Sequence, residues 1–124
     1  MRKSSPRSLP SLSLRIDLDA HGRIGPGKIA LLENIRSCGS ISAAGRAMNM
    51  QYKRAWVLVN EINSACKRAA VEPREGGKNG GGAMLTPFGA SLVARYRRIE
   101  RLVESAIHKD LLALAADTNG SRKA

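Results

Sequence analysis

Residues 39–63, GSISAAGRAMNMQYKRAWVLVNEIN, decide the fold of this chain because they have the pattern of two helices joined by a tight turn. Ser40 or Ser42 can cap the first helix, since a serine hydroxyl accepts a hydrogen bond from an unpaired backbone N–H of the first turn. Small residues follow and permit close approach of another helix. Asn49 tolerates the left-handed backbone of a turn, so we expect the first helix to end there.

The second helix begins near Met50 or Gln51 and continues past Ile62. Its apolar positions recur at helical spacing and predict a buried face; they are Ala55, Val59, Ile62 and Cys66. Its first turns are polar and basic instead. In a helix-turn-helix the second helix enters the DNA major groove, where amide and guanidinium groups pair with base edges. The residues that we expect in the groove are Gln51, Tyr52, Lys53 and Arg54. The alternative is an ordinary helical hairpin with a solvated polar end.

The charge of the chain favours a polyanionic partner. Its 124 residues fit one domain, and 21 Lys and Arg against 10 Asp and Glu give a formal net charge of +11. Such a field attracts double-stranded DNA first and an anionic membrane surface second. A generally basic protein without such a partner is the alternative.

Other classes of function find little support in the sequence. Cys38 and Cys66 are not in a metal-ligand spacing, and we expect both as free buried thiols, with no cofactor. No apolar run reaches the roughly 18 residues of a membrane span. Paired carboxylates and a Ser/His/Asp set are missing, so we expect no enzyme. A cytoplasmic, nucleoid-associated protein without a membrane partner is the prediction.

The segments before the helix-turn-helix are predicted from local patterns. Residues 1–11 are expected to be a disordered basic arm, and residues 12–18 alternate as a half-buried strand does. Residues 25–30 match a dinucleotide-binding fingerprint, but the acid expected about 20 residues further on is missing. We therefore expect a turn and then a helix over residues 26–38, which Gly39 ends. Its apolar stripe comprises Ile29, Leu32 and Ile35.

Two short β runs around a glycine-rich loop predict a hairpin over residues 70–85, the wing of a winged helix-turn-helix. Pro73 restricts the first run to a sheet edge or a bulge. In this arrangement Arg74, Lys78 and Asn79 would clamp the DNA backbone, and Ser40 and Ser42 would hold a phosphate. A flexible glycine linker is the alternative.

The last helix is predicted to be long and to mediate dimerisation. Thr86 and Pro87 form a typical helix start, and apolar residues then recur at spacings of three and four as far as Leu114. This stripe corresponds to about 42 Å of helix, which is too long for a small core to cover. We expect a helix over 87–117 that pairs with a symmetric partner. The predicted dimer contacts are Leu92, Tyr96, Ile99, Val103, Ile107 and Leu111. Residues 118–124 are expected to be a tail.

The runs YKRAW at 52–56 and GGKNGGGA at 76–83 together resemble the DNA-binding domain of the ModE family of molybdate-responsive regulators. The resemblance covers about residues 12–115, and LysR-type regulators are similar more distantly. It implies a winged helix-turn-helix regulator that dimerises through its terminal helix, in some cases also through the N-terminal strand. Full-length relatives carry C-terminal oxyanion-binding domains of the Mop type, whereas this sequence ends at Ala124. We therefore expect a chain that binds no molybdate itself.

The sequence as a whole predicts a mainly α fold with a small β-wing, formed by a domain over residues 12–117 with its helix-turn-helix at 40–66. The predicted function is sequence-specific DNA binding by a homodimeric transcription regulator. A non-specific or architectural nucleic-acid-binding protein is the alternative. For Trp56, at the edge of the apolar face of the second helix, we expect packing in the core, under the wing or against helix 26–38, rather than along the DNA backbone.

Overall fold

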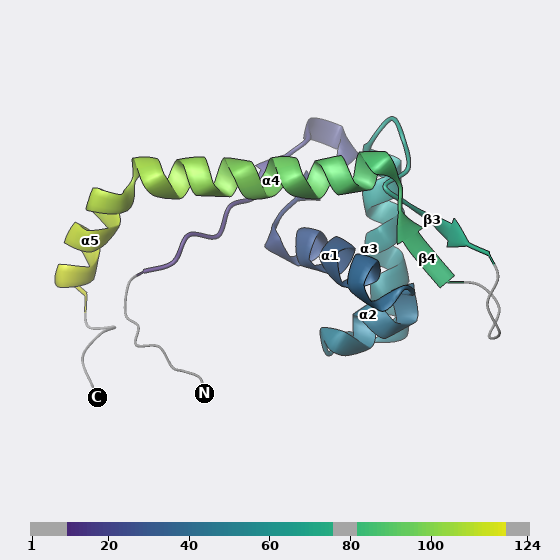
Figure 1. Cartoon of the computed structure of the whole chain (residues 1–124). Helices are drawn as coiled ribbons and strands as arrows, with labels where there is room; N and C mark the ends of the chain where they lie inside the picture. Colours follow the sequence, from purple (N-terminus) through teal and green to yellow (C-terminus); the bar gives the residue numbers. More distant parts are fainter. Residues whose placement is uncertain (1–9, 76–81, 119–124) are drawn as a thin grey trace. The chain divides into compact units, whose positions relative to one another are not determined.

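Figure 1 shows a computed structural model of the chain, which describes residues 10–75 and 82–118. Residues 14–97 form one unit, which contains α1, α2, α3, two β-hairpins and the beginning of α4. Residues 98–118 belong to a second unit, together with residues 10–13. The fold is mainly helical with small antiparallel hairpins, which confirms the predicted winged helix-turn-helix class.

Helix α1 (Pro26–Cys38) has the predicted bounds and the predicted caps. Pro26 occupies the first turn of the helix. Backbone N–H groups there have no acceptor within the helix, so the missing N–H of proline costs no hydrogen bond. Gly39 has a φ of 81° and donates its N–H to the carbonyl of Ile35, which ends the helix. The side chains that α1 buries are Ile29, Leu31, Leu32 and Ile35.

The predicted helix-turn-helix is confirmed as α2 (Ile41–Ala47) and α3 (Tyr52–Ala65). The Ser40 hydroxyl accepts a hydrogen bond of 3.0 Å from the N–H of Ala43 and so caps α2. Asn49 adopts the expected left-handed backbone with a φ of 57°. Gly45 lets the two helices approach, because a Cβ there would lie 3.1 Å from the Cβ of Ala55.

The wing is an antiparallel hairpin of β3 (Val71–Arg74) and β4 (Gly82–Leu85), with Pro73 opposite Ala83. The Asn63 side chain attaches it to α3: its Oδ1 accepts from the N–H groups of Ala70 at 2.8 Å and Val71 at 3.2 Å, and its Nδ2 donates to the Val71 carbonyl at 3.1 Å. The N–H of Ala83 donates to the carbonyl of Gly39 at 2.9 Å. The hairpin is therefore fixed both to α3 and to the junction of α1 and α2.

The N-terminal strand is shorter than predicted. Only β1 (Ile16–Asp17) is a strand, and it pairs with β2 (Arg23–Ile24) across the short 3-10 helix η1 (Asp19–His21). The carbonyl of Leu14 accepts a hydrogen bond from the Tyr96 hydroxyl instead of from a neighbouring strand. The alternating pattern of residues 12–18 thus reflects contact with a helix as much as strand pairing.

Helix α4 (Pro87–Ala106) starts as predicted, since the Thr86 hydroxyl accepts from the N–H of Gly89 at 2.9 Å. The prediction of one helix over 87–117 is wrong, because α5 (His108–Ala116) follows as a separate helix (Figure 1). Ile107 between them has a φ of −107° and a ψ of 11°. The sequence has neither Pro nor Gly near this point, so no residue typical of a helix break marks it.

Both cysteines are free, but Cys38 is exposed and Cys66 half-buried, so the expectation of two buried thiols is wrong for Cys38. Cys38 is the last residue of α1 and follows the end of its apolar stripe. Within residues 10–75 and 82–118, no three or more His, Cys, Asp or Glu side chains are grouped as metal ligands. No helix in the same ranges combines the length and the hydropathy that a membrane span requires.

Candidate nucleic-acid interface

The helix α3 divides into a buried face and an exposed outer face. Ala55, Leu58, Val59 and Ile62 turn into the core of the first unit. Side chains advance by about 100° per residue around a helix. The side of α3 that faces away from the core therefore carries Lys53, Trp56, Val57 and Asn60, all of which are exposed. We call these four residues the outer face of α3.

The four residues predicted to enter the groove lie together at the start of α3, and all four are exposed. Gln51 is the N-cap residue, although its side chain makes no capping hydrogen bond. In the described part of the chain, no acidic side chain pairs with Lys53 or Arg54. This end of the helix therefore combines hydrogen-bond donors with uncompensated positive charge, as a polyanion-binding surface requires.

Trp56 does not lie in the core, contrary to our expectation. Its side chain is 41% exposed, and its ring makes an edge contact with Tyr52 at a centroid distance of 6.2 Å and an interplanar angle of 70°. Beside it a cavity of about 140 Å³ separates α3 from the wing, with Val71 and Ala83 among its lining residues. The reason is rotational: Ala55 and Val59 fill the core-facing positions, and Trp56 is turned toward the wing.

Arg74 packs against the backbone at the start of the helix-turn-helix. A Cβ on Gly39 would come within 3.0 Å of Nη2 of Arg74, so the guanidinium lies directly over this glycine. Ser40 and Ser42 follow in the chain and are half-buried. The hydroxyl of Ser40 is engaged in capping α2, as described above. Lys78 and Asn79, the other predicted wing contacts, lie outside the described residues.

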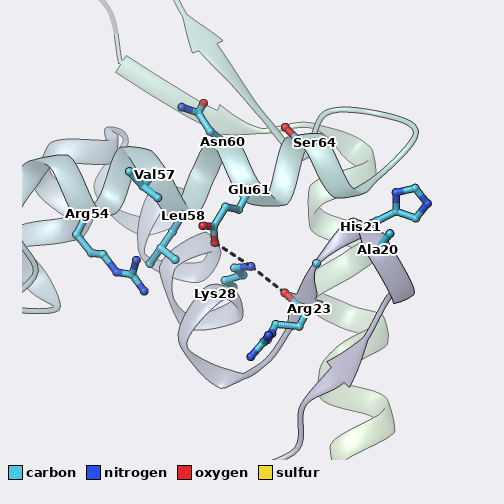
Figure 2. A pocket seen from close by; sticks show the side chains of 11 residues that line it. Ala20, His21, Arg23, Lys28, Arg54, Val57, Leu58, Asn60, Glu61 and Ser64 are labelled. Atoms are coloured by element: carbon cyan, nitrogen blue, oxygen red, sulfur yellow. Dashed lines mark hydrogen bonds and ion pairs between the residues drawn. The ribbon is translucent and has the colours of Figure 1, made fainter.

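On the side of α3 away from the wing lies a larger cavity of about 720 Å³ (Figure 2). Figure 2 shows Arg54 reaching it from α3 and Arg23 from β2, on either side of an ion pair between Lys28 and Glu61. In that pair Nζ of Lys28 is 3.2 Å from Oε1 of Glu61, and it also donates to the Arg23 carbonyl at 2.8 Å. Lys28 is therefore compensated, whereas the two arginines have no acidic partner among the described residues.

Asn60 is an interface candidate that the sequence analysis missed. It is exposed and lines both cavities, which places it on the crest of the outer face between them. Asparagine can form two hydrogen bonds with adenine in the major groove. The signal was present in the sequence, because Asn60 follows Lys53 by two helical turns and lies opposite the buried stripe.

The predicted dimer contacts fall into two groups. Tyr96 is 2% exposed, and Leu92 packs against the core of the first unit, so the protomer itself uses both side chains. Their role as dimer contacts stays a prediction. The remaining four are half-buried and lie beyond the first unit: Ile99, Val103, Ile107 and Leu111. Three leucines in the same part of the chain are about half exposed: Leu102, Leu112 and Leu114.

A capped two-helix motif, an exposed basic start of its second helix and a hairpin fixed beside it define a winged helix-turn-helix protein. The chain is homologous to ModE transcriptional regulators. It is 39% identical to the transcriptional regulator ModE of Haemophilus influenzae over 85 residues, which cover 68% of this chain and 33% of the relative. The DNA-binding transcriptional dual regulator ModE of Escherichia coli K12 is 38% identical over 81 residues, or 65% and 31% of the two chains.

The molybdenum-pterin-binding protein MopB of Rhodobacter capsulatus is 46% identical over 78 residues, which are 63% of this chain and 29% of that protein. The chain thus spans about a third of the length of the curated relatives that it matches. These relatives are named as regulators or binding proteins and not as enzymes. No protein-family model matches the chain.

Proposed function

We propose that the chain is a cytoplasmic, sequence-specific DNA-binding transcription regulator that acts as a homodimer. The observation that carries this proposal is the start of α3, where Lys53 and Arg54 are exposed and have no acidic partner among the described residues. The net charge of +11 supports a polyanionic partner. The names of the ModE relatives support a role in transcription.

The geometry suggests different roles for the residues of α3. Lys53 and Asn60 share the exposed outer face, which supports a role for both in contacts with base edges, together with Gln51 and Tyr52 at the beginning of the helix. Arg54 is turned toward the larger cavity and is better placed for the phosphate backbone (Figure 2). Arg74 would contact the DNA backbone on the side of the wing. The phosphate contacts of Ser40, Ser42, Lys78 and Asn79 stay predictions.

Non-specific or architectural binding is the competing function, because the same charge attracts any duplex. The two functions differ in the ratio of affinities for selected and random DNA. Duplexes are first selected from a random pool with the wild-type protein. A wild-type affinity ratio near one would then favour the architectural function and contradict specific recognition.

Lys53→Ala is expected to weaken binding to the selected duplex by about 1–3 kcal/mol, because it removes a base contact, and to weaken random binding less. Titrations by fluorescence anisotropy measure both affinities. Lys109→Ala is the matched control, since it removes the same charge from an exposed position on α5. Equal losses on both duplexes would assign Lys53 to the phosphates instead.

Dimerisation through the region after residue 97 is part of the proposal. Half-buried and exposed apolar side chains alternate there, and the described chain buries none of them completely. A second copy supplies the simplest cover, because two-fold pairing joins the same surface of both protomers. Such a dimer requires inverted half-sites spaced by about one helical turn of DNA or a multiple of it.

We further propose that the regulated process concerns molybdenum while this domain binds no molybdate. The first part is supported only by the names of relatives such as the molybdenum transport protein ModE of Azotobacter vinelandii, 34% identical over 106 residues. The absence of molybdate binding is supported by the larger cavity. Its most enclosed cation, Lys28, already forms an ion pair with Glu61 and so offers no free charge to an oxyanion. Calorimetry with molybdate is expected to give no saturable heat, and micromolar binding that sulfate does not match would contradict this.

A further inference from the structure

Two large apolar side chains on the outer face of α3 are exposed. Trp56 is 41% exposed and Val57 is 44% exposed, although the buried face of the same helix is complete without them. Both are next to Lys53 and Asn60, the candidate base contacts. Apolar side chains at the centre of a surface whose edges are polar mark a binding site more often than a solvated face.

The ring of Trp56 lies between Tyr52 and the wing. Tyr52, one helical turn earlier, contacts it edge to face at 6.2 Å. On its other side the ring adjoins the cavity of about 140 Å³ at the wing, and the Asn63 hydrogen bonds fix the wing to α3. A tryptophan ring supplies a large contact area at a low cost in conformational entropy, because its side chain has only two rotatable bonds.

The surroundings of this apolar pair indicate the chemistry of its partner. Lys53 and Arg54 lie beside it without acidic partners among the described residues, so a partner that also carries negative charge is favoured. DNA provides that charge on its phosphates, and the 5-methyl group of thymine is the apolar group that its major groove presents. A purely apolar protein surface would leave both cations unpaired and desolvated, which is unfavourable.

We propose that Trp56 and Val57 contact thymine 5-methyl groups in the major groove and thereby determine part of the sequence preference. This inference rests on the proposed function, since it requires that α3 enters the groove. It adds apolar readout to the hydrogen bonds of Lys53 and Asn60, and it predicts that the preferred sites contain thymine at positions facing the middle of α3.

The test replaces each thymine of a selected duplex, one at a time, by deoxyuridine, which lacks only the 5-methyl group. Wild-type protein is expected to bind about three- to fivefold more weakly for each contacted thymine, the loss that one buried methyl group implies. In Trp56→Ala or Val57→Ala the same replacement is expected to have no effect at the thymine that the missing side chain contacts. Met84→Ala, which truncates an exposed apolar side chain on β4, is the control and should keep the full wild-type loss.

Each outcome is decisive. Wild-type protein that tolerates deoxyuridine at every position, or variants that lose as much as wild type at every position, overturn the inference. An even loss on selected and random DNA in Trp56→Ala assigns the ring to the sugar-phosphate backbone and also overturns it. The two variants truncate exposed side chains, and far-ultraviolet circular dichroism should be used to check that both fold. A preference for the selected duplex without any deoxyuridine effect leaves the proposed function intact, whereas a missing preference contradicts that function first.

Discussion

The helices α3 and α4 are both amphipathic, but they bury their apolar faces to different extents. In α3 the buried residues extend from Ala55 to Ile62, within one unit of the protomer. In α4 the buried residues are Gly89, Val93 and Tyr96, all before Arg98, where the second unit begins. The protomer therefore buries the apolar face of α3 along its whole length, and only the outer face of this helix is left for a ligand. In α4 the protomer buries the apolar face of the first half only, which is why we propose that a second copy covers the rest.

The largest effect on stability should come from the first half of α4, whose apolar face is buried within the protomer. A Cβ on Gly89 would lie 2.1 Å from the carbonyl oxygen of Ala70, and that carbonyl is held by the N–H of Thr86 at 3.0 Å. We expect Gly89→Ala to lower the free energy of unfolding by about 3 kcal/mol, because backbone atoms must move apart.

Urea unfolding measures this change. Gly27→Ala on α1 is the control, because a Cβ at Gly27 would meet no atom within 4 Å. That substitution should leave stability unchanged or raise it by up to about 1 kcal/mol, since alanine is favoured over glycine in helices. If Gly89→Ala is as stable as Gly27→Ala, α4 does not depend on close contact with the end of α3 and the wing.

Substitutions in the second half of α4, whose apolar face is not fully buried in the protomer, should weaken dimerisation and leave folding unchanged. Val103→Asp is expected to weaken the dimer about a hundredfold, because a carboxylate would be buried in an apolar interface. Sedimentation of the protein without DNA measures the mass, and Glu104→Gln at the adjacent exposed position is the control. A dimer that survives truncation after Tyr96 would place the interface elsewhere, for example at the N-terminal strand.

The smallest effect on stability is expected at the ion pair that joins α1 to the first half of α4. Arg97 donates to both oxygens of Glu33, at 3.0 Å and 2.7 Å, and this hydrogen bonding holds the pKa of Glu33 below its ordinary value of 4.5. Because the pKa is lower in the folded state, the pair stabilises the fold above that ordinary value and loses this contribution as the pH falls through the folded pKa.

Glu33→Gln should therefore cost about 0.5–1 kcal/mol at pH 7, a modest value because both side chains are about one third exposed, 33% and 34%. The difference from wild type should shrink below pH 4.5 and in high salt. Urea unfolding at several pH values measures it. A difference that does not change with pH would mean that Glu33 contributes by packing rather than by charge.

The same comparison shows what the sequence could predict. Signals that act within a few residues were sufficient for the helix-turn-helix: the cap at Ser40, the turn at Asn49 and the stop at Gly39 all lie where the pattern placed them. The start of α4 at Thr86 was equally local. Each of these depends on a side chain or a φ angle that its own segment determines.

Features that depend on distant contacts were missed. Trp56 lies at the border of the apolar stripe, and its ring adjoins a wing that residues further along the chain form. Residues 12–18 alternate, yet Leu14 bonds to Tyr96 far along the chain instead of to a neighbouring strand. The break at Ile107 leaves an apolar periodicity that continues on both sides, so the pattern alone suggested one helix.

The three hydrogen bonds of Asn63 make the wing and α3 one mechanical piece. In the proposed complex neither part could adjust to a duplex without moving the other, so both would have to fit the same DNA at the same time. A duplex whose grooves have the wrong width or spacing would lose one of the two proposed contacts, even where every contacted base is correct. If the proposed function holds, discrimination by DNA shape would then follow from one half-buried amide, at base pairs that no side chain touches.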